Sequence, residues 1–116
     1  MSSNKEIVKK LDECFRRQDW HGMLPYLADD VVREEVGAPE LVRGKDAFEK
    51  NMVPGPEVER MVSETSRMIE EGNVVVSEGT VLIQKKDGTK LKIRFCDVHE
   101  FERGKLKRQT TYTAVV

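Results

Sequence analysis

Apolar residues near the start of the chain recur at the spacing of a helix. Five of them would share one face of that helix: Ile7, Val8, Leu11, Cys14 and Phe15. Just before them, Ser3 and Glu6 have the spacing of a capping box, in which each side chain satisfies a backbone N–H at the helix start. The pattern therefore predicts an amphipathic helix that begins after Ser3 and ends near Arg17.

Shorter elements are predicted in the segment that follows. A second helix is expected over residues 20–28, and Pro25 inside it makes that helix irregular. A strand over residues 31–36 is followed by a short return partner over residues 40–43. A brief third helix over residues 45–52 then completes the helical half of the chain.

Beyond residue 57 the pattern changes from helical spacing to strands separated by turns. The turns at residues 87–88 and 103–104 carry the glycines that tight hairpins require. Four strands are therefore predicted, over residues 58–69, 74–84, 90–101 and 106–115. Helices segregated from a run of strands are typical of the α+β class. We expect one domain over residues 1–116, in which about three helices cover the concave face of a curved, mainly antiparallel sheet.

The predicted strand over residues 90–101 carries an unusual face. Phe95, Asp97, His99 and Phe101 alternate along it and point to the same side. The phenylalanines indicate that this side faces the core, yet it also holds a carboxylate and an imidazole. A buried carboxylate is costly unless it is paired, protonated or used in chemistry. Asp97 is therefore a candidate functional residue, and pairing with a nearby cation or backbone amide is the structural alternative.

The composition of the chain argues against nucleic-acid-binding, membrane and metal-binding proteins. The 20 Lys and Arg residues nearly balance the 21 Asp and Glu residues, so a net charge of −1 predicts no broad attraction to nucleic acid or to a membrane surface. No segment has the apolar length of a membrane span, and the first residues lack the apolar run of a signal peptide. A soluble, cytoplasmic protein is expected. The two cysteines lie far apart and the two histidines form no ligand motif, so no metal site is expected.

Three stretches of the sequence resemble a known superfamily. They are YLADDVVREEVG at residues 26–37, VRGKDAFEK at residues 42–50 and FCDVHEFERGKLKRQTTY at residues 95–112. In this order and spacing they resemble the nuclear transport factor 2-like superfamily, and more closely its SnoaL-like and ketosteroid-isomerase branch. The resemblance implies a cone-shaped α+β fold, an enclosed apolar pocket for a small-molecule ligand or substrate, and a homodimer packed through the sheet.

The same resemblance implies roles for individual residues. Glu35 occupies the position of the proton-shuttling base of ketosteroid isomerases, and Asp97 that of a neutral acid that stabilises the enolate. The tyrosine that shares this task in those enzymes is absent from the first helix, and His99 is a candidate substitute donor. His99 as a satisfied core residue is the alternative. The pocket lining implied by the resemblance and the strand faces comprises Phe15, Phe95, Phe101, Gln109 and Thr111.

Two functions of different class remain open at this stage. The first is a cofactor-independent enzyme that moves a proton on an apolar carbonyl compound, with isomerisation as the plainest outcome and dehydration or polyketide cyclisation as variants. The second is a non-catalytic ligand-binding or dimeric interaction domain. Epoxide hydrolysis is less well supported, because that branch places an aspartate on the final strand, where this chain has Thr110 and Thr111.

Overall fold

The computed structural model describes residues 3–116. Two helices and a 3₁₀ helix accompany six strands: α1 (Asn4–Arg16), η1 (His21–Tyr26), β1 (Leu27–Glu35), β2 (Val42–Arg43), α2 (Lys45–Met52), β3 (Val58–Glu71), β4 (Val74–Lys85), β5 (Lys90–Glu102) and β6 (Lys105–Val115). None of the helices within residues 3–116 is long and apolar enough to cross a membrane.

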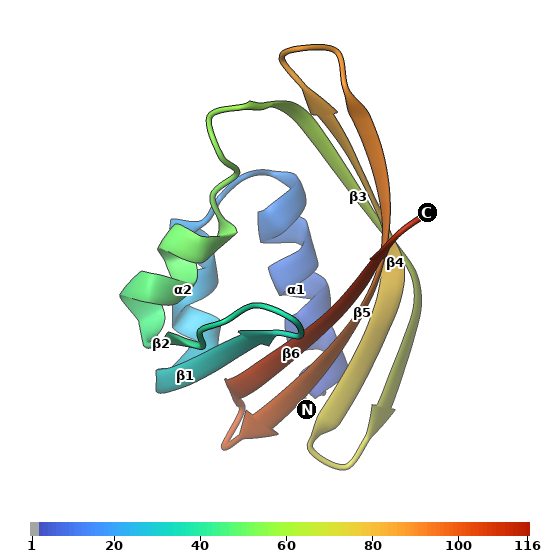
Figure 1. Cartoon of the computed structure of the whole chain (residues 1–116). Helices are drawn as coiled ribbons and strands as arrows, with labels where there is room; N and C mark the ends of the chain where they lie inside the picture. Colours follow the sequence, from blue (N-terminus) through green and yellow to red (C-terminus); the bar gives the residue numbers. More distant parts are fainter. Residues whose placement is uncertain (1–2) are drawn as a thin grey trace.

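The six strands form one curved sheet in the order β2-β1-β6-β5-β4-β3. Strands β3 to β6 follow one another as antiparallel hairpins, whereas β1 pairs in parallel with β6. The helices all lie on the concave side of this sheet (Figure 1). This arrangement confirms the predicted α+β class with a mainly antiparallel curved sheet.

Helix α1 begins and packs as the sequence predicts. The Ser3 hydroxyl accepts a hydrogen bond from the backbone N–H of Glu6 at 3.3 Å, which satisfies one of the free donors at the helix start. Val8 and Leu11 on its apolar face are buried in the core. The core beneath the helices is a single cluster: Val8, Leu11, Met23, Leu27, Val31, Phe48, Val75, Phe101 and Leu106.

The segment between α1 and β1 differs from the prediction. A 3₁₀ helix over His21–Tyr26 replaces the expected helix over residues 20–28, because Pro25 lacks the N–H that an α-helix would need there. Strand β1 begins earlier than expected, at Leu27, which is 1% exposed and pairs with Leu106. The predicted return strand over residues 40–43 is reduced to Val42–Arg43.

Strands β3 and β4 contain a local irregularity that allows close packing. The register of their pairing shifts between Thr65 and Arg67, opposite Gly79 on β4. A Cβ atom at position 79 would collide with the backbone carbonyl of Glu64 and with the ring of Phe95. Gly79 therefore lets the bulged β3 and the Phe95 ring approach β4 where a larger residue would not fit.

Candidate functional site

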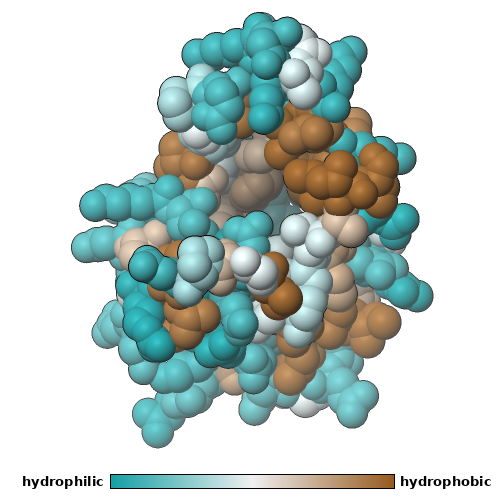
Figure 2. Space-filling view, viewed as in Figure 1, coloured by the Kyte–Doolittle hydropathy of each residue, from teal (hydrophilic) through white to brown (hydrophobic). Residues whose placement is uncertain are grey.

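A cavity of about 570 Å³ lies between the helices and the concave face of the sheet. Figure 2 shows a hollow in the face where these layers meet, with apolar residues gathered along its rim. Both α-helices, the 3₁₀ helix and five strands contribute to its lining. The apolar part includes Leu11, Phe15, Phe48, Met52, Met61 and Phe95. Its size and apolar walls suit a small organic molecule.

Most of the polar side chains of the cavity lie in two neighbouring rows on the concave face of the sheet. A row here is a set of residues that lie opposite one another on adjacent strands. Because opposed residues of paired strands point to the same side, each row follows from the strand register. The first row consists of Glu35 on β1, Thr111 on β6, Asp97 on β5 and Ser77 on β4. The second row consists of Arg33, Gln109, His99 and Val75 on the same four strands.

Asp97 lies in the first row with its carboxyl group in the cavity wall. Its Oδ2 atom accepts a weak hydrogen bond from Nε2 of Gln109 at 3.5 Å, and its Oδ1 atom is buried without a partner among residues 3–116. Burial raises the pKa of this carboxyl to about 6, and the nearby Thr111, Arg33 and Gln109 offset only part of the effect. Asp97 thus changes protonation close to neutral pH.

His99 is the neighbour of Asp97 in the second row and is 2% exposed. Its Nδ1 atom lies 3.1 Å from the backbone carbonyl oxygen of Val75, and its Nε2 atom lies 3.4 Å from Nε2 of Gln109. Burial lowers the pKa of His99, so the imidazole is neutral at neutral pH. A neutral imidazole whose two nitrogens both have partners does not add charge to the site.

Arg33 is a cavity residue that the sequence analysis missed. Its side chain is 12% exposed, and its guanidinium donates to Oδ1 of Asn51 at 2.8 Å and to Oγ1 of Thr111 at 3.3 Å. The Oε2 atom of Glu35 lies 3.8 Å from the same guanidinium, and the Glu35 side chain is 47% exposed. Arg33 was detectable in principle, because it shares a strand face with Glu35 two residues away.

Asp12 on α1 is a second missed residue of the cavity. The Thr65 hydroxyl donates a hydrogen bond to its Oδ2 atom at 2.8 Å, and burial raises its pKa. The signal was present in the sequence, since Asp12 lies four residues after Val8 and three before Phe15, within the apolar stripe of the helix. The cavity therefore contains carboxyl groups from α1, β1 and β5.

All but one of the site residues predicted from the sequence line the cavity. Glu35, Asp97, His99, Phe15, Phe95, Gln109 and Thr111 all line the cavity. Phe101 does not, because the pairing of β5 with β6 shifts register between Glu100 and Phe101, and the ring packs into the core. The assignment of Phe101 to the pocket is therefore corrected.

The side chains that line the cavity determine which reactions the site could catalyse. It combines a carboxyl whose pKa is raised to about 6, a largely buried guanidinium and largely apolar walls. Within residues 3–116, no three His, Cys, Asp or Glu side chains gather closely enough to hold a metal ion. Proton transfer, with Arg33 as the nearby positive charge, is the chemistry that these side chains can supply themselves.

Comparison with known proteins agrees with this fold. The sequence matches the SnoaL-like domain over residues 8–109, so the chain belongs to the SnoaL-like family of the nuclear transport factor 2-like superfamily. Among proteins with curated descriptions, none matches the chain.

Solved structures show the same architecture. An NTF2-like protein of unknown function from Burkholderia pseudomallei is 27% identical, with a TM-score of 0.81 over 100% of this chain and 92% of that one. An LEH-like epoxide hydrolase from M. tuberculosis is 20% identical, with a TM-score of 0.81 over 96% and 82%. A ketosteroid-isomerase-like protein from Kribbella flavida is 17% identical, with a TM-score of 0.76 over 96% and 77%. The last two likenesses establish the fold alone.

Proposed function

We propose that the protein is a cofactor-independent enzyme that moves a proton on an apolar carbonyl compound held in the cavity. The observation that carries this proposal is the Asp97 carboxyl, which is buried in a largely apolar cavity and has a pKa of about 6. A group with this pKa is mostly ionised at neutral pH yet still returns a proton readily, which is the property that a general base needs.

The electrostatics favour Asp97 as the base. A carboxyl that acted only as a neutral acid would need a pKa above the working pH, whereas that of Asp97 is about 6. Glu35, to which the resemblance gave the role of base, is half-exposed and lies beside Arg33. We therefore assign proton abstraction to Asp97 and charge stabilisation to Arg33, with Glu35 helping to hold the guanidinium in place.

The proposed step is a balanced proton transfer. Asp97 takes a proton from the carbon next to the carbonyl group, and the electrons of the C–H bond move to the carbonyl oxygen to form an enolate. The positive charge of Arg33 stabilises that oxygen through space. If a C=C bond is conjugated with the enolate, return of the proton from Asp97 to the far carbon of that system gives an isomer. If the adjacent carbon carries a hydroxyl group, that group takes the proton from Asp97 and leaves as water, which gives dehydration.

Hydrogen exchange at the substrate carbon tests this function without knowledge of the natural substrate. A panel of apolar cyclic ketones would be incubated in D₂O with the wild-type protein, with Asp97→Asn and with Glu35→Gln, and deuterium uptake followed by proton NMR. We expect Asp97→Asn to lower the exchange rate at least about 100-fold, and Glu35→Gln to lower it less. Saturable binding with no exchange by the wild-type protein would instead identify a non-catalytic binding domain.

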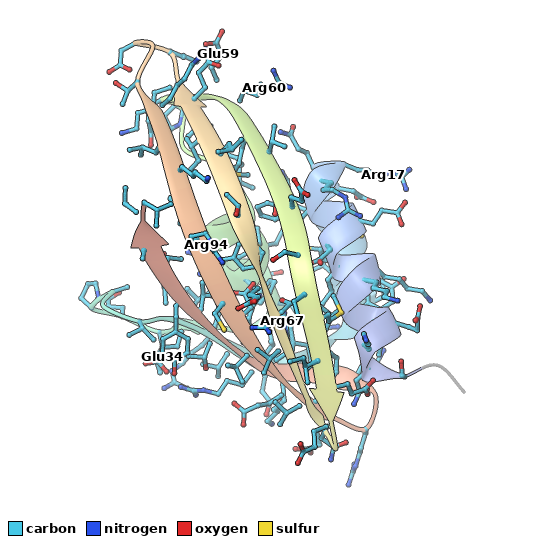
Figure 3. All side chains as sticks on the ribbon, turned by 90° about the vertical axis from the view of Figure 1, so that its right-hand side faces the viewer. Arg17, Glu34, Glu59, Arg60, Arg67 and Arg94 are labelled. Carbon is cyan, nitrogen blue, oxygen red and sulfur yellow. The ribbon has the colours of Figure 1, made fainter. Side chains whose placement is uncertain are left out.

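We further propose that two copies of the chain associate through the outer face of the sheet. Large apolar side chains on this face are 42–53% exposed: Val62, Ile69, Leu82 and Tyr112. Figure 3 looks onto the same face, where Arg67 and Arg94 lie among the strands. A mixed apolar and charged surface of this kind suits a second copy of the chain, as the family resemblance implies.

A further inference from the structure

A chain of polar contacts connects the backbone of β4 to the carboxyl group of Asp97. It begins at the carbonyl oxygen of Val75, which lies 3.1 Å from Nδ1 of His99. It continues from Nε2 of His99 to Nε2 of Gln109 at 3.4 Å. It ends with the same amide nitrogen 3.5 Å from Oδ2 of Asp97. His99 does not itself touch Asp97 in this chain, because Gln109 lies between them.

The first contact determines the tautomer of His99. A backbone carbonyl can only accept a hydrogen bond, so the Nδ1 atom that faces Val75 must carry the hydrogen. The ring is neutral because burial lowers its pKa. The Nε2 atom therefore has no hydrogen and can act only as an acceptor.

The acceptor at Nε2 in turn determines which way the Gln109 amide points. Only the NH₂ end of an amide can donate to an acceptor, so this end must face His99. The second hydrogen of the same NH₂ group is then available for Asp97, and the Gln109 Oε1 atom is left buried without a partner among residues 3–116. The reversed amide would set two acceptors against each other at both contacts.

We propose that His99 is a positioning residue, which acts through Gln109 to keep a hydrogen-bond donor facing the Asp97 carboxylate. A donor at this place favours the ionised form of Asp97, the form that abstracts a proton. The inference thus rests on the proposed function for its catalytic meaning, although the contacts themselves do not depend on it. The charged groups that also face this carboxyl are Asp12 from α1 and Arg33 and Glu35 from β1.

Two substitutions of His99 separate positioning from simple packing. His99→Asn retains a donor near the Val75 carbonyl but removes the acceptor that faces Gln109. His99→Gln places an amide oxygen near the former Nε2 atom and so restores that acceptor. Because both variants replace an aromatic ring with an amide, general losses of packing are similar. Thr113→Val is the matched control, since Thr113 lines the cavity and makes no side-chain hydrogen bond among the described residues.

The readout is the pKa of Asp97, measured by NMR titration of its labelled carboxyl carbon. We expect His99→Asn to raise this pKa by about one unit, and His99→Gln and Thr113→Val to leave it near the wild-type value. An unchanged pKa in His99→Asn would overturn the proposal. If the wild-type protein catalyses no ketone exchange but the variants show these pKa values, the proposed function is refuted and the positioning role stands.

A second measurement covers the case in which His99→Asn does not fold. Nitrogen-15 NMR of the wild-type protein reports directly which ring nitrogen of His99 carries the hydrogen. We expect the Nδ1–H tautomer from about pH 6 to pH 8. The Nε2–H tautomer would overturn the proposal, because the Gln109 amide would then have to turn its oxygen toward His99.

Discussion

At the scale of single residues, the main feature of the site is the buried carboxyl group of Asp97, which has few hydrogen-bond partners. Asp97 has only a long hydrogen bond from Gln109, and its Oδ1 atom is buried and unpartnered among residues 3–116. A purely structural aspartate would normally be paired more completely, because an uncompensated buried charge destabilises the fold. Incomplete pairing at a cavity wall is what a proton-transfer group requires.

This burial predicts a stability gain for Asp97→Asn that depends on pH. The folded protein holds the Asp97 proton more tightly than the unfolded chain, so ionisation destabilises the fold progressively between the pKa of 3.8 and the pKa of about 6. The variant lacks this ionisation. Its free energy of unfolding, measured in urea, should exceed that of the wild type by an amount that grows by up to about 3 kcal/mol between about pH 4 and pH 7.

The wild-type protein provides the reference at every pH, so carboxyls that titrate in both proteins cancel. A difference between the two proteins that stays constant with pH would show that the pKa of Asp97 is not raised.

Some of these residues were predictable from strand alternation and others were not. Alternation on β5 placed Asp97 and His99 on one face, because side chains two positions apart share a face. Alternation also paired Gln109 with Thr111 on β6, but only the family resemblance indicated that their face lines the pocket. Arg33 is harder to predict, because Glu34 and Glu35 follow it and a charged stretch of this kind is typical of a solvated strand face. The hydrogen bonds among these side chains depend on strand register and rotamers, and neither follows from a single sequence.

At the scale of elements, the bulge of β3 beside Gly79 brings two strands and the Phe95 ring close together. The predicted strand boundaries agree with β3, β4, β5 and β6 to within a few residues, because turn glycines and alternation mark them clearly. The parallel pairing of β1 with β6 joins segments far apart in the chain, so local patterns do not reveal it. The 3₁₀ helix was likewise not separable from a short irregular helix by spacing alone.

Gly79→Ala should destabilise the protein through overpacking. The added Cβ would collide with the Glu64 carbonyl, which belongs to the backbone and cannot move aside as a side-chain tip would. We expect a loss of roughly 1–3 kcal/mol in the free energy of unfolding, measured in urea. Thr80→Ala, at the next position of the same strand, should have a smaller effect. Equal stability of Gly79→Ala and the wild type would contradict the close approach described for this bulge.

At the scale of the whole molecule, the two faces of the curved sheet carry the two proposed functions. Its concave face carries the cavity and the polar rows, and its outer face carries the exposed apolar residues proposed to pair with a second copy. Because side chains on the two faces alternate along each strand, changes on one face need not disturb the other. Association and proton transfer should therefore be separable by mutation.

Ile69→Lys is expected to convert the proposed dimer to a monomer, because it introduces a charge into the outer apolar face. Sedimentation velocity would measure the change. Leu41→Lys is the matched control, since Leu41 is also an exposed apolar residue but precedes β2 at the other edge of the sheet. A wild-type protein that sediments as a monomer would refute the dimer and leave the proposed enzyme chemistry untouched.

The pKa of Asp97 in the wild-type protein is the most direct test of the central claim. It would be measured by carbon-13 NMR titration of the carboxyl resonances, with the Asp97 signal identified by its absence in Asp97→Asn. We predict a value of about 6, as expected for a buried carboxyl that exchanges protons near neutral pH. A value of about 4 or below would show an ordinary, well-solvated or ion-paired carboxylate and would contradict the role of Asp97 as the base.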